Sequence, residues 1–303
     1  MADHSSATWC RAGIALLAAF HCAAAGQSYA SVCSPPSTGE FLVVDQWNLE
    51  TTNIAADGLH SVGDVEQSYR ARLWHRRQGD HAHVMRFSHD YRAYEIETSP
   101  DRALRTNGHL HRLALSYRFT GPSWELSVAP VLAGSSNAGR HPKVIDAEFI
   151  FWQAVARHRR ALAPTVDGFW GVCRDDRSGS TRLTPVFGIE WRLNDQLDVT
   201  LGFPDTRLIW RTHPRLRLQA DIHPAGGRWR VYDDALVRRS PFAMESWRLR
   251  LGLAFRITHA HELIIGGGRE VQREFAFRLL DGTDIRTEAG NAAFTRIGWR
   301  WRR

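Results

Sequence analysis

Arginine side chains recur at every second position in several apolar segments of the chain. The segment from Trp247 to Thr258, WRLRLGLAFRIT, carries Arg248, Arg250 and Arg256 at this spacing. Because a β-strand turns alternate side chains to opposite faces, these guanidinium groups would share one face. A guanidinium group is planar and binds carboxylates or phosphates through two parallel hydrogen bonds. The pattern therefore indicates a cationic surface suited to anions.

The same spacing extends this surface to other segments. Arginine supplies 38 of the 39 basic residues (39 − 1, the exception being Lys143). In a closed barrel we expect one shared inward face, and the predicted lumen-facing residues are Arg215, Arg217, Arg248, Arg250, Arg256, Arg296, Arg300, Glu190 and Asp221. A water-filled lumen with excess positive charge would attract small anionic solutes. Alternatively, arginine–carboxylate pairs fill the lumen as a polar core and leave no channel.

Three His-x-His pairs in the sequence are candidate metal ligands. They are His81/His83, His109/His111 and His259/His261. On a strand, residues i and i+2 share a face, so each pair could chelate Zn²⁺ or Cu²⁺. No pattern supplies a fixed third ligand, so neither a metal site nor another cofactor is predicted.

Catalytic motifs are absent from the sequence. No Gly-x-Ser-x-Gly elbow occurs, and Gly266-Gly267-Gly268 lacks the lysine of a phosphate loop. Ser88, His89 and Asp90 are contiguous, but neighbours in a strand face opposite ways. No catalytic residue is therefore predicted, and we expect a protein that is not an enzyme. A lipid hydrolase with a serine near His89 or His111 on the barrel wall remains the alternative.

Period-two alternation defines the elements that must position these side chains. In the segment above, Leu249, Leu251, Phe255 and Ile257 oppose the arginines. The same pattern recurs over 112–119, 124–132, 187–194, 197–203, 215–222 and 296–301. Turn formers such as Gly121-Pro122, Pro204-Asp205 and His213-Pro214 separate these runs, and longer polar stretches lie near 51–63, 98–109, 135–143 and 164–181. Residues 147–161 are compatible with a helix or a strand.

Two features favour a membrane barrel over a soluble β-sandwich. Tryptophans stand toward the ends of the apolar faces, where Trp124, Trp191, Trp247, Trp299 and Trp301 fit aromatic girdles at the two membrane interfaces. Arginine dominates the opposite face. In a sandwich that face would meet water, where lysine and glutamate would serve as well as arginine. Short turns alternating with longer loops are also typical of outer-membrane barrels. A soluble secreted β-domain that binds a ligand is the other alternative.

The first thirty residues resemble an export signal. Arg11 precedes the short apolar run IALLAAF, and small residues follow up to Ala30. We therefore expect a signal peptide over 1–30 and one barrel domain over 31–303, of about 12 strands (10–14) at on the order of 20 residues per strand. No later run of eighteen apolar residues occurs. Cys33 and Cys173 could pair in an oxidising compartment, and two free thiols are an equal alternative.

The net charge of +7 is compatible with nucleic acid, anionic lipid or an anionic solute. The arginines are dispersed through apolar segments instead of forming a run, which argues against nucleic acid. The expected location is the outer membrane of a Gram-negative bacterium, and the expected partners are outer-membrane lipid and the barrel-assembly machinery, with small anionic solutes if the lumen is open.

The block from Pro185 to Tyr232 resembles bacterial outer-membrane β-barrel proteins known only as a domain of unknown function. The matching positions are a Gly-Phe-Pro turn, an arginine and a Gly-Gly-x-Trp stretch: Gly202, Phe203, Pro204, Arg207, Gly226, Gly227 and Trp229. The segment Ser123 to Gly134 is similar to an earlier strand of that family. The resemblance implies fold and location, not activity. One departure is that Trp301 is followed by Arg302 and Arg303, whereas such barrels usually end on an aromatic residue.

Overall fold

The structure is a computed structural model that describes residues 32–33, 40–55, 59–98, 108–234, 237–279 and 281–302. The expected signal peptide, residues 1–30, and most of the expected loop over 98–109 lie outside the described residues. Within the described part, no helix combines the length and the apolar composition needed to cross a membrane.

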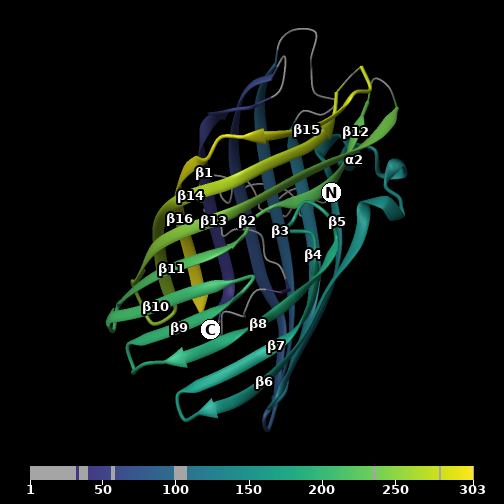
Figure 1. Ribbon diagram of the computed structural model, residues 1–303. Helices are drawn as coiled ribbons and strands as arrows, with labels where there is room; N and C mark the ends of the chain where they lie inside the picture. Colours follow the sequence, from purple (N-terminus) through teal and green to yellow (C-terminus); the bar gives the residue numbers. More distant parts are fainter. Residues whose placement is uncertain are drawn as a thin grey trace, which may run out of the picture.

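The described strands form one antiparallel sheet that closes on itself (Figure 1). β1 pairs with β2 on one side and with β16 on the other, so the sheet has no free edge there. The strands are β1 (Glu40–Asn53), β2 (Leu59–Gln78), β3 (His81–Thr98), β4 (His109–Thr120), β5 (Trp124–Ser135), β6 (Ile150–Ala163), β7 (Val166–Asp175), β8 (Arg182–Arg192), β9 (Leu197–Phe203), β10 (Thr206–His213), β11 (Leu216–Pro224), β12 (Gly227–Asp233), β13 (Arg238–Arg256), β14 (His261–Arg278), β15 (Asp284–Ala289) and β16 (Ala292–Arg302).

Two pairs of these elements are single strands with a short interruption. β11 and β12 pair with β13 in one continuous register, from Pro224 opposite Trp247 to Gly227 opposite Met244. β15 and β16 continue each other along β14 in the same way. The sixteen described elements therefore form a closed barrel of fourteen strands, β1 to β11, β13, β14 and β16.

Fourteen strands is the upper bound of the expected 10–14 and exceeds the central expectation of about twelve. Residues 166–175, expected within a polar loop over 164–181, form strand β7. β9 and β10 are two separate short strands of 7 and 8 residues, so the Gly-Phe-Pro turn closes a hairpin. Residues 150–163, for which a helix was an alternative, form β6. Connections shorter than expected accommodate the additional strands.

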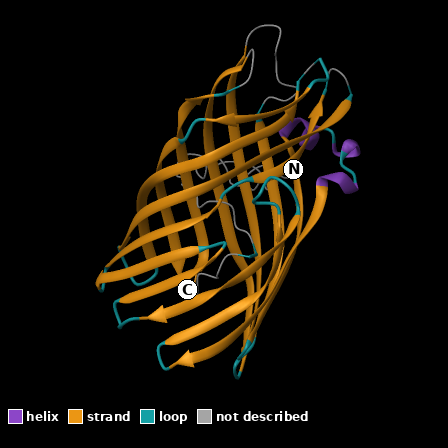
Figure 2. Ribbon diagram, in the orientation of Figure 1, coloured by secondary structure: helices purple, strands orange, loops and turns teal. Residues whose placement is uncertain are grey.

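The barrel has a turn end and a loop end. The short connections 79–80, 121–123, 164–165, 193–196, 214–215 and 257–260 lie at the turn end, together with the start of β1 and the end of β16. The connection between β5 and β6 lies at the loop end and contains α2 (Ser136–Arg140), η1 (Pro142–Val144) and η2 (Ala147–Phe149). Figure 2 shows these helices outside the barrel wall.

The barrel narrows toward the loop end. β6 to β10 are grouped at the turn end, and beyond them β12 approaches β5 directly, with Arg230 opposite Gly134 (Figure 1). The backbone amide of Tyr232 also donates to Ser135 Oγ at 3.0 Å. Among the described elements, the loop-end ring is β1 to β5 with β12, β13, β14 and β15, which is nine strands. Strand number sets the width of a barrel, so the loop end is the narrow end.

Side-chain exposure confirms the predicted alternation. In β13, Leu251, Phe255 and Ile257 are 69%, 45% and 53% exposed, whereas Arg248 and Arg250 are buried. A second sheet packed over this face would have buried those apolar side chains. Exposed tryptophans lie toward the turn end at Trp74, Trp124, Trp170, Trp191 and Trp210, and Trp152 is exposed near the opposite end of the wall, at the start of β6. The prediction of two aromatic girdles stays a prediction, and Trp247, one of its members, lies near the middle of β13.

The interior has three layers between the two ends. An apolar cap fills the loop end and is formed by Tyr94, Leu110, Trp229, Val231, Phe242, Met244, Phe275 and Phe277, all buried. An ionic layer lies in the middle and is formed by Asp64, Glu66, Arg92, Arg248, Glu270 and Arg273. A cavity with many arginines in its lining, the arginine cavity, occupies the turn end.

Candidate functional site

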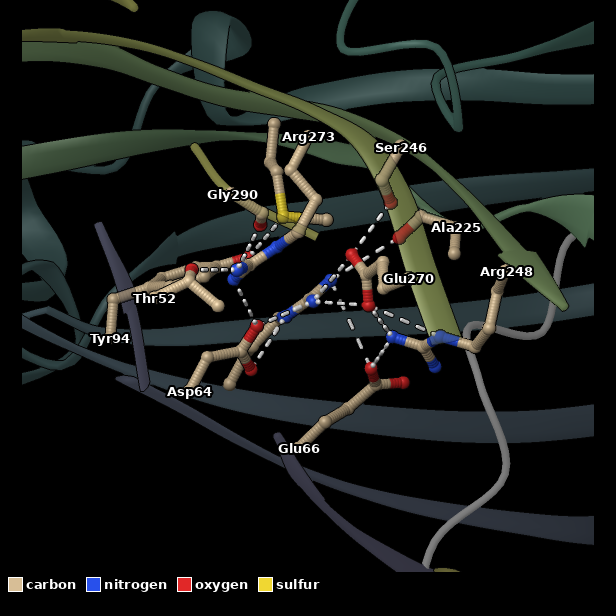
Figure 3. A network of polar contacts seen from close by, with 12 residues as sticks. Thr52, Asp64, Glu66, Tyr94, Ala225, Ser246, Arg248, Glu270, Arg273 and Gly290 are labelled. Carbon is tan, nitrogen blue, oxygen red and sulfur yellow. Dashed lines mark hydrogen bonds and ion pairs between the residues drawn. The ribbon is translucent and has the colours of Figure 1, made fainter. Parts of the chain in front are cut away.

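The ionic layer joins strands from opposite sides of the barrel (Figure 3). Glu270 on β14 accepts from Arg248 Nη2 at 2.6 Å and from Arg92 Nη2 at 3.2 Å. Arg92 on β3 also donates to Asp64 at 2.7 Å, and Arg248 donates to Glu66 at 3.0 Å. Three arginines thus face three carboxylates in this layer, so its formal charge balances.

The position of each charge in this layer follows from strand periodicity. Asp64 and Glu66 are two residues apart on β2 and both point inward. Arg273 follows Gln272, whose φ of 53° marks a bulge in β14. The guanidinium group of Arg273 donates to Thr52 Oγ1 at 2.7 Å and to the carbonyl of Gly290 at 3.3 Å. Buried ion pairs are stable only when such additional hydrogen bonds satisfy the remaining polar atoms.

A second buried cluster comes from the connection between β7 and β8, which folds into the barrel. Arg112 on β4 forms two hydrogen bonds to Asp176, at 2.5 and 2.7 Å. Arg177 donates to Asp175 at 2.5 Å and to Asp205 at 3.1 Å. Burial alone would lower the pKa of Arg177, but these two carboxylates outweigh it and hold the pKa above its ordinary value. The connection therefore places charged side chains in the interior of the barrel.

Gly226 lets this connection approach the interruption between β11 and β12. Its backbone amide donates to the carbonyl of Arg177 at 2.9 Å. A Cβ atom at this position would collide with the carbonyl oxygens of Met244 and Arg177. Glycine is therefore required here by close backbone contact.

A disulfide fixes residues 32–33 inside the barrel. Cys33 is bonded to Cys173 on β7, with 5.7 Å between their Cα atoms, which resolves the two alternatives in favour of pairing. The carbonyl of Val32 accepts from Arg118 Nη2 at 3.0 Å. Both Val32 and Cys33 are buried against inward side chains of β4 to β8. Residues 32–33 thus occupy part of the lumen.

The arginine cavity has a volume of about 760 Å³ and reaches the turn end, because turn residues Asp195, His213 and Pro214 line it. Five lining residues are acidic: Glu40, Asp195, Asp198, Asp205 and Glu262. Twelve are arginines: Arg70, Arg72, Arg86, Arg118, Arg207, Arg211, Arg215, Arg217, Arg250, Arg256, Arg300 and Arg302. The lining therefore carries an excess of seven positive charges (12 − 5).

Several of these arginines have a buried donor atom without a hydrogen-bond acceptor among the described residues, but Arg217 and Arg302 each donate to Glu262 through another nitrogen. Arg70, through Nε and Nη2, and Arg207, through Nε, have such donors and form no ion pair with a described carboxylate. A buried guanidinium N–H without a partner is costly, and an anion would satisfy it. By contrast, Arg250 is paired with Asp221 at 2.5 Å. The cavity thus combines neutralised arginines with arginines that can take an anionic ligand.

The structure places the predicted lumen-facing residues at different depths. Arg215, Arg217, Arg250, Arg256 and Arg300 line the arginine cavity, and Arg248 belongs to the ionic layer. Arg296 is buried and pairs with Asp45 at 2.7 Å. Asp221 pairs with Arg250 at 2.5 Å and with His223 Nδ1 at 2.8 Å. Glu190 pairs with Arg157 and Arg159 at 3.4 and 2.8 Å.

Sequence reasoning missed the contributions of β2 and β3 to the cavity. Arg70, Arg72 and Arg86 come from these strands. The available signal was a polar residue at every second position, as in the run Asp64, Glu66, Ser68, Arg70 and Arg72. A strand whose inner face is wholly polar is as periodic as one whose outer face is wholly apolar.

None of the His-x-His pairs converges on a shared metal position in the described residues. His83 contacts the hydroxyl of Tyr117 at 2.7 Å, and His109 lies against Tyr91. His261 stacks on Trp299, while the adjacent Glu262 points inward to Arg300. The prediction of no metal site remains a prediction.

Comparisons with solved structures give only distant likenesses to outer-membrane barrels. The NanC porin is 7% identical, with a TM-score of 0.34, over 85% of this chain and 100% of that chain. The Pseudomonas putida toluene transporter TodX is 11% identical, with a TM-score of 0.33, over 88% and 90%. The translocator domain of the Neisseria meningitidis autotransporter NalP is 9% identical, with a TM-score of 0.34, over 89% and 91%.

These likenesses carry no argument about solute, partner or mechanism at such identities and TM-scores. No protein-family model and no curated protein matches the chain. The resemblance to the family of unknown function therefore stays a prediction.

Proposed function

We propose that the protein is an outer-membrane barrel that binds a small polyanion in the arginine cavity and is closed to ion flow in this conformation. The observation that carries the proposal is the excess of seven positive charges in a cavity of about 760 Å³. The unpartnered donors of Arg70 and Arg207 are the proposed first contacts of the anion. Phosphate and carboxylate groups match their geometry.

The outer surface supports a membrane location. Apolar side chains such as Leu251, Ile257 and Phe187 are more than half exposed in the isolated chain. A contiguous apolar surface of this kind is rare on soluble monomers and is expected where strands face lipid. Exposed tryptophans near the turn end fit an interface between lipid and water.

Closure of the lumen is supported by the apolar cap and the ionic layer. Arg248, Glu270, Phe242, Met244 and Phe275 are each no more than 1% exposed, although they point into the barrel. An open pore would leave such inward side chains in contact with water. In the loop-end ring of nine strands, side chains suffice to fill the interior.

Titration calorimetry with citrate or tripolyphosphate tests the binding function. We expect binding at low salt that weakens with ionic strength, because the contacts are ionic. The double variant Arg70→Gln/Arg207→Gln should lose about tenfold or more in affinity, since charged hydrogen bonds contribute roughly 1.5–3 kcal/mol each. The control Arg286→Gln alters an exposed arginine on β15 and should bind as the wild type does. Equal affinities for all three proteins would refute the cavity as the binding site.

Planar-bilayer recording tests the closed lumen. The refolded wild type should show no channel steps at any salt concentration, because the apolar cap and the ionic layer fill the barrel. A stable open channel would contradict closure while leaving anion binding intact.

Membrane fractionation tests the location. A membrane barrel should appear in the outer-membrane pellet and show heat-dependent gel mobility. Recovery in the soluble fraction would instead support the secreted β-domain.

A further inference from the structure

A serine and two histidines form a hydrogen-bonded chain on the outer wall of the barrel. Ser136 Oγ lies 2.8 Å from His111 Nε2. His111 Nδ1 lies 3.1 Å from His89 Nε2, and the planes of the two imidazole rings differ by 8°. Ser136 Oγ has one weaker contact, 3.4 Å to the carbonyl oxygen of His109. Each ring nitrogen of His111 thus faces a different partner, as in a catalytic triad.

Strand pairing fixes this arrangement. His111 on β4 lies opposite Tyr91 on β3, so His89 is its diagonal neighbour. Both histidines share the face of Leu113, which is exposed on the outer wall. Ser136 is the first residue of α2, directly after β5. The three side chains therefore come from neighbouring elements, β3, β4 and the start of α2.

An apolar groove of about 360 Å³ adjoins the three side chains. Ser136, His111 and His89 lie in its lining, with Leu113, Leu132, Ala138, Ile145 and Phe149. Arg140 is the one lining residue with a permanent positive charge among those described. The groove continues onto the outer wall, where Leu113 and Leu115 are exposed. A lipid acyl chain entering sideways from the bilayer matches this surface.

We propose that this groove is a serine hydrolase site for carboxylic esters of membrane lipids. Ser136 is the nucleophile and His111 the general base, both catalytic residues. His89 is a positioning residue whose Nε2 accepts a hydrogen bond from the Nδ1–H group of His111 and so directs Nε2 of His111 toward Ser136. The acyl chain occupies the groove, and Arg140 is placed to attract an anionic headgroup or the developing oxyanion. The proposal shares with the anion cavity only the membrane location.

The reaction balances with water as the second substrate. Ser136 Oγ bonds to the ester carbonyl carbon while its proton passes to His111 Nε2. The bond to the alcohol oxygen then breaks, and the alcohol leaves with the proton from His111. Water next gives a proton to His111 and adds as hydroxide to the acyl carbon. The Ser136–carbon bond breaks, the fatty acid leaves, and Ser136 regains its proton.

Active-site labelling and a lipid assay test the proposal. A fluorophosphonate probe should label the refolded wild type, and vesicles of dipalmitoyl phosphatidylethanolamine should release palmitate. Ser136→Ala should abolish both signals, and His111→Gln should lower palmitate release at least a hundredfold. Ser123→Ala, at an exposed serine of the turn end, is the matched control and should behave as the wild type does. Heat-dependent gel mobility verifies that each variant is folded.

Two results would overturn the proposal. One is a folded wild type that neither takes the probe nor releases palmitate. The other is a Ser136→Ala variant with unchanged palmitate release. Citrate binding should be unaffected by Ser136→Ala, so failure of this site is distinguishable from failure of the cavity.

The pH profile separates a positioning role of His89 from a merely structural one. His89→Ala should lower palmitate release, and His89→Asp should restore part of it. A carboxylate beside His111 favours the imidazolium, so the acidic limb of the profile should move to higher pH in His89→Asp. An unmoved limb in an active His89→Asp variant would exclude the proposed contact.

Discussion

The substitution Glu270→Gln probes the ionic layer with almost no change of volume. Glu270 Oε2 accepts from Arg248, and Oε1 accepts from Ser246 at 2.6 Å and from Arg92. A glutamine side chain has an NH₂ group in place of one of these oxygens. That NH₂ group would face N–H or O–H donors of Arg248, Arg92 or Ser246. The layer would also hold three arginines against two carboxylates (3 − 1 = 2), so one positive charge would be buried without compensation.

Breaking a buried ion pair by removing one partner costs about 3–5 kcal/mol. We therefore expect the free energy of unfolding in lipid vesicles to fall by about that amount, at least a hundredfold in the equilibrium constant. Urea unfolding followed by tryptophan fluorescence measures it. The matched control is Glu274→Gln, four residues further along β14, where the partner Arg286 is 71% exposed. An exposed pair contributes about 0–1 kcal/mol.

Equal losses for the two variants would refute the reasoning. They would mean that water already reaches Glu270, and hence that the middle of the barrel is open. Channel steps in Glu270→Gln but not in the wild type would instead identify the ionic layer as the barrier to ion flow.

Three further predictions concern the outer wall, the disulfide and the ion pair between Asp45 and Arg296. Leu251→Lys should cost about 2–4 kcal/mol in vesicles if the site lies near the bilayer midplane, whereas Leu251→Phe should be almost neutral; a loss near zero for lysine would place this face in water. Intact mass under non-reducing conditions should be 2 Da below that of the reduced protein, with neither Cys33 nor Cys173 alkylated, because the two are paired across 140 residues; free thiols in the folded protein would contradict the pairing. Gly298→Ala should lower the free energy of unfolding by about 1–3 kcal/mol, because a Cβ would press on Asp45, which binds Arg296; an unchanged urea midpoint would show that Asp45 can move aside.

The faces of the strands were predictable from the sequence because one physical requirement repeats along the whole wall. In β13, the same parity that exposes Leu251 buries Arg248 and Arg250. One misplaced residue would move every side chain to the wrong face, so the period-two pattern is strongly constrained. The depth of the arginines along the barrel was not predictable in this way, since depth depends on the register of partner strands.

Strand number and long-range contacts were less predictable from the sequence. The connection over 176–181 is polar, and nothing local shows that Asp176 and Arg177 turn inward to meet Arg112 and Asp205. Likewise, Ser136 and His111 are 25 residues apart and meet only because β4 pairs with β5. The tertiary position of a hydroxyl beside an imidazole has no signature in the spacing alone.

The change in circumference along the barrel has a consequence for how the lumen could ever open. At the narrow end, the wall strands bring the interior side chains together, so the proposed closure of the lumen depends on the small number of strands in the wall. Releasing residues 32–33 by reduction of the disulfide would enlarge the chamber but leave the far end sealed. Separation of β12 from β5 near Arg230 and Gly134 would widen the ring at this end. The contact between β12 and β5 therefore sets the width of the narrow end.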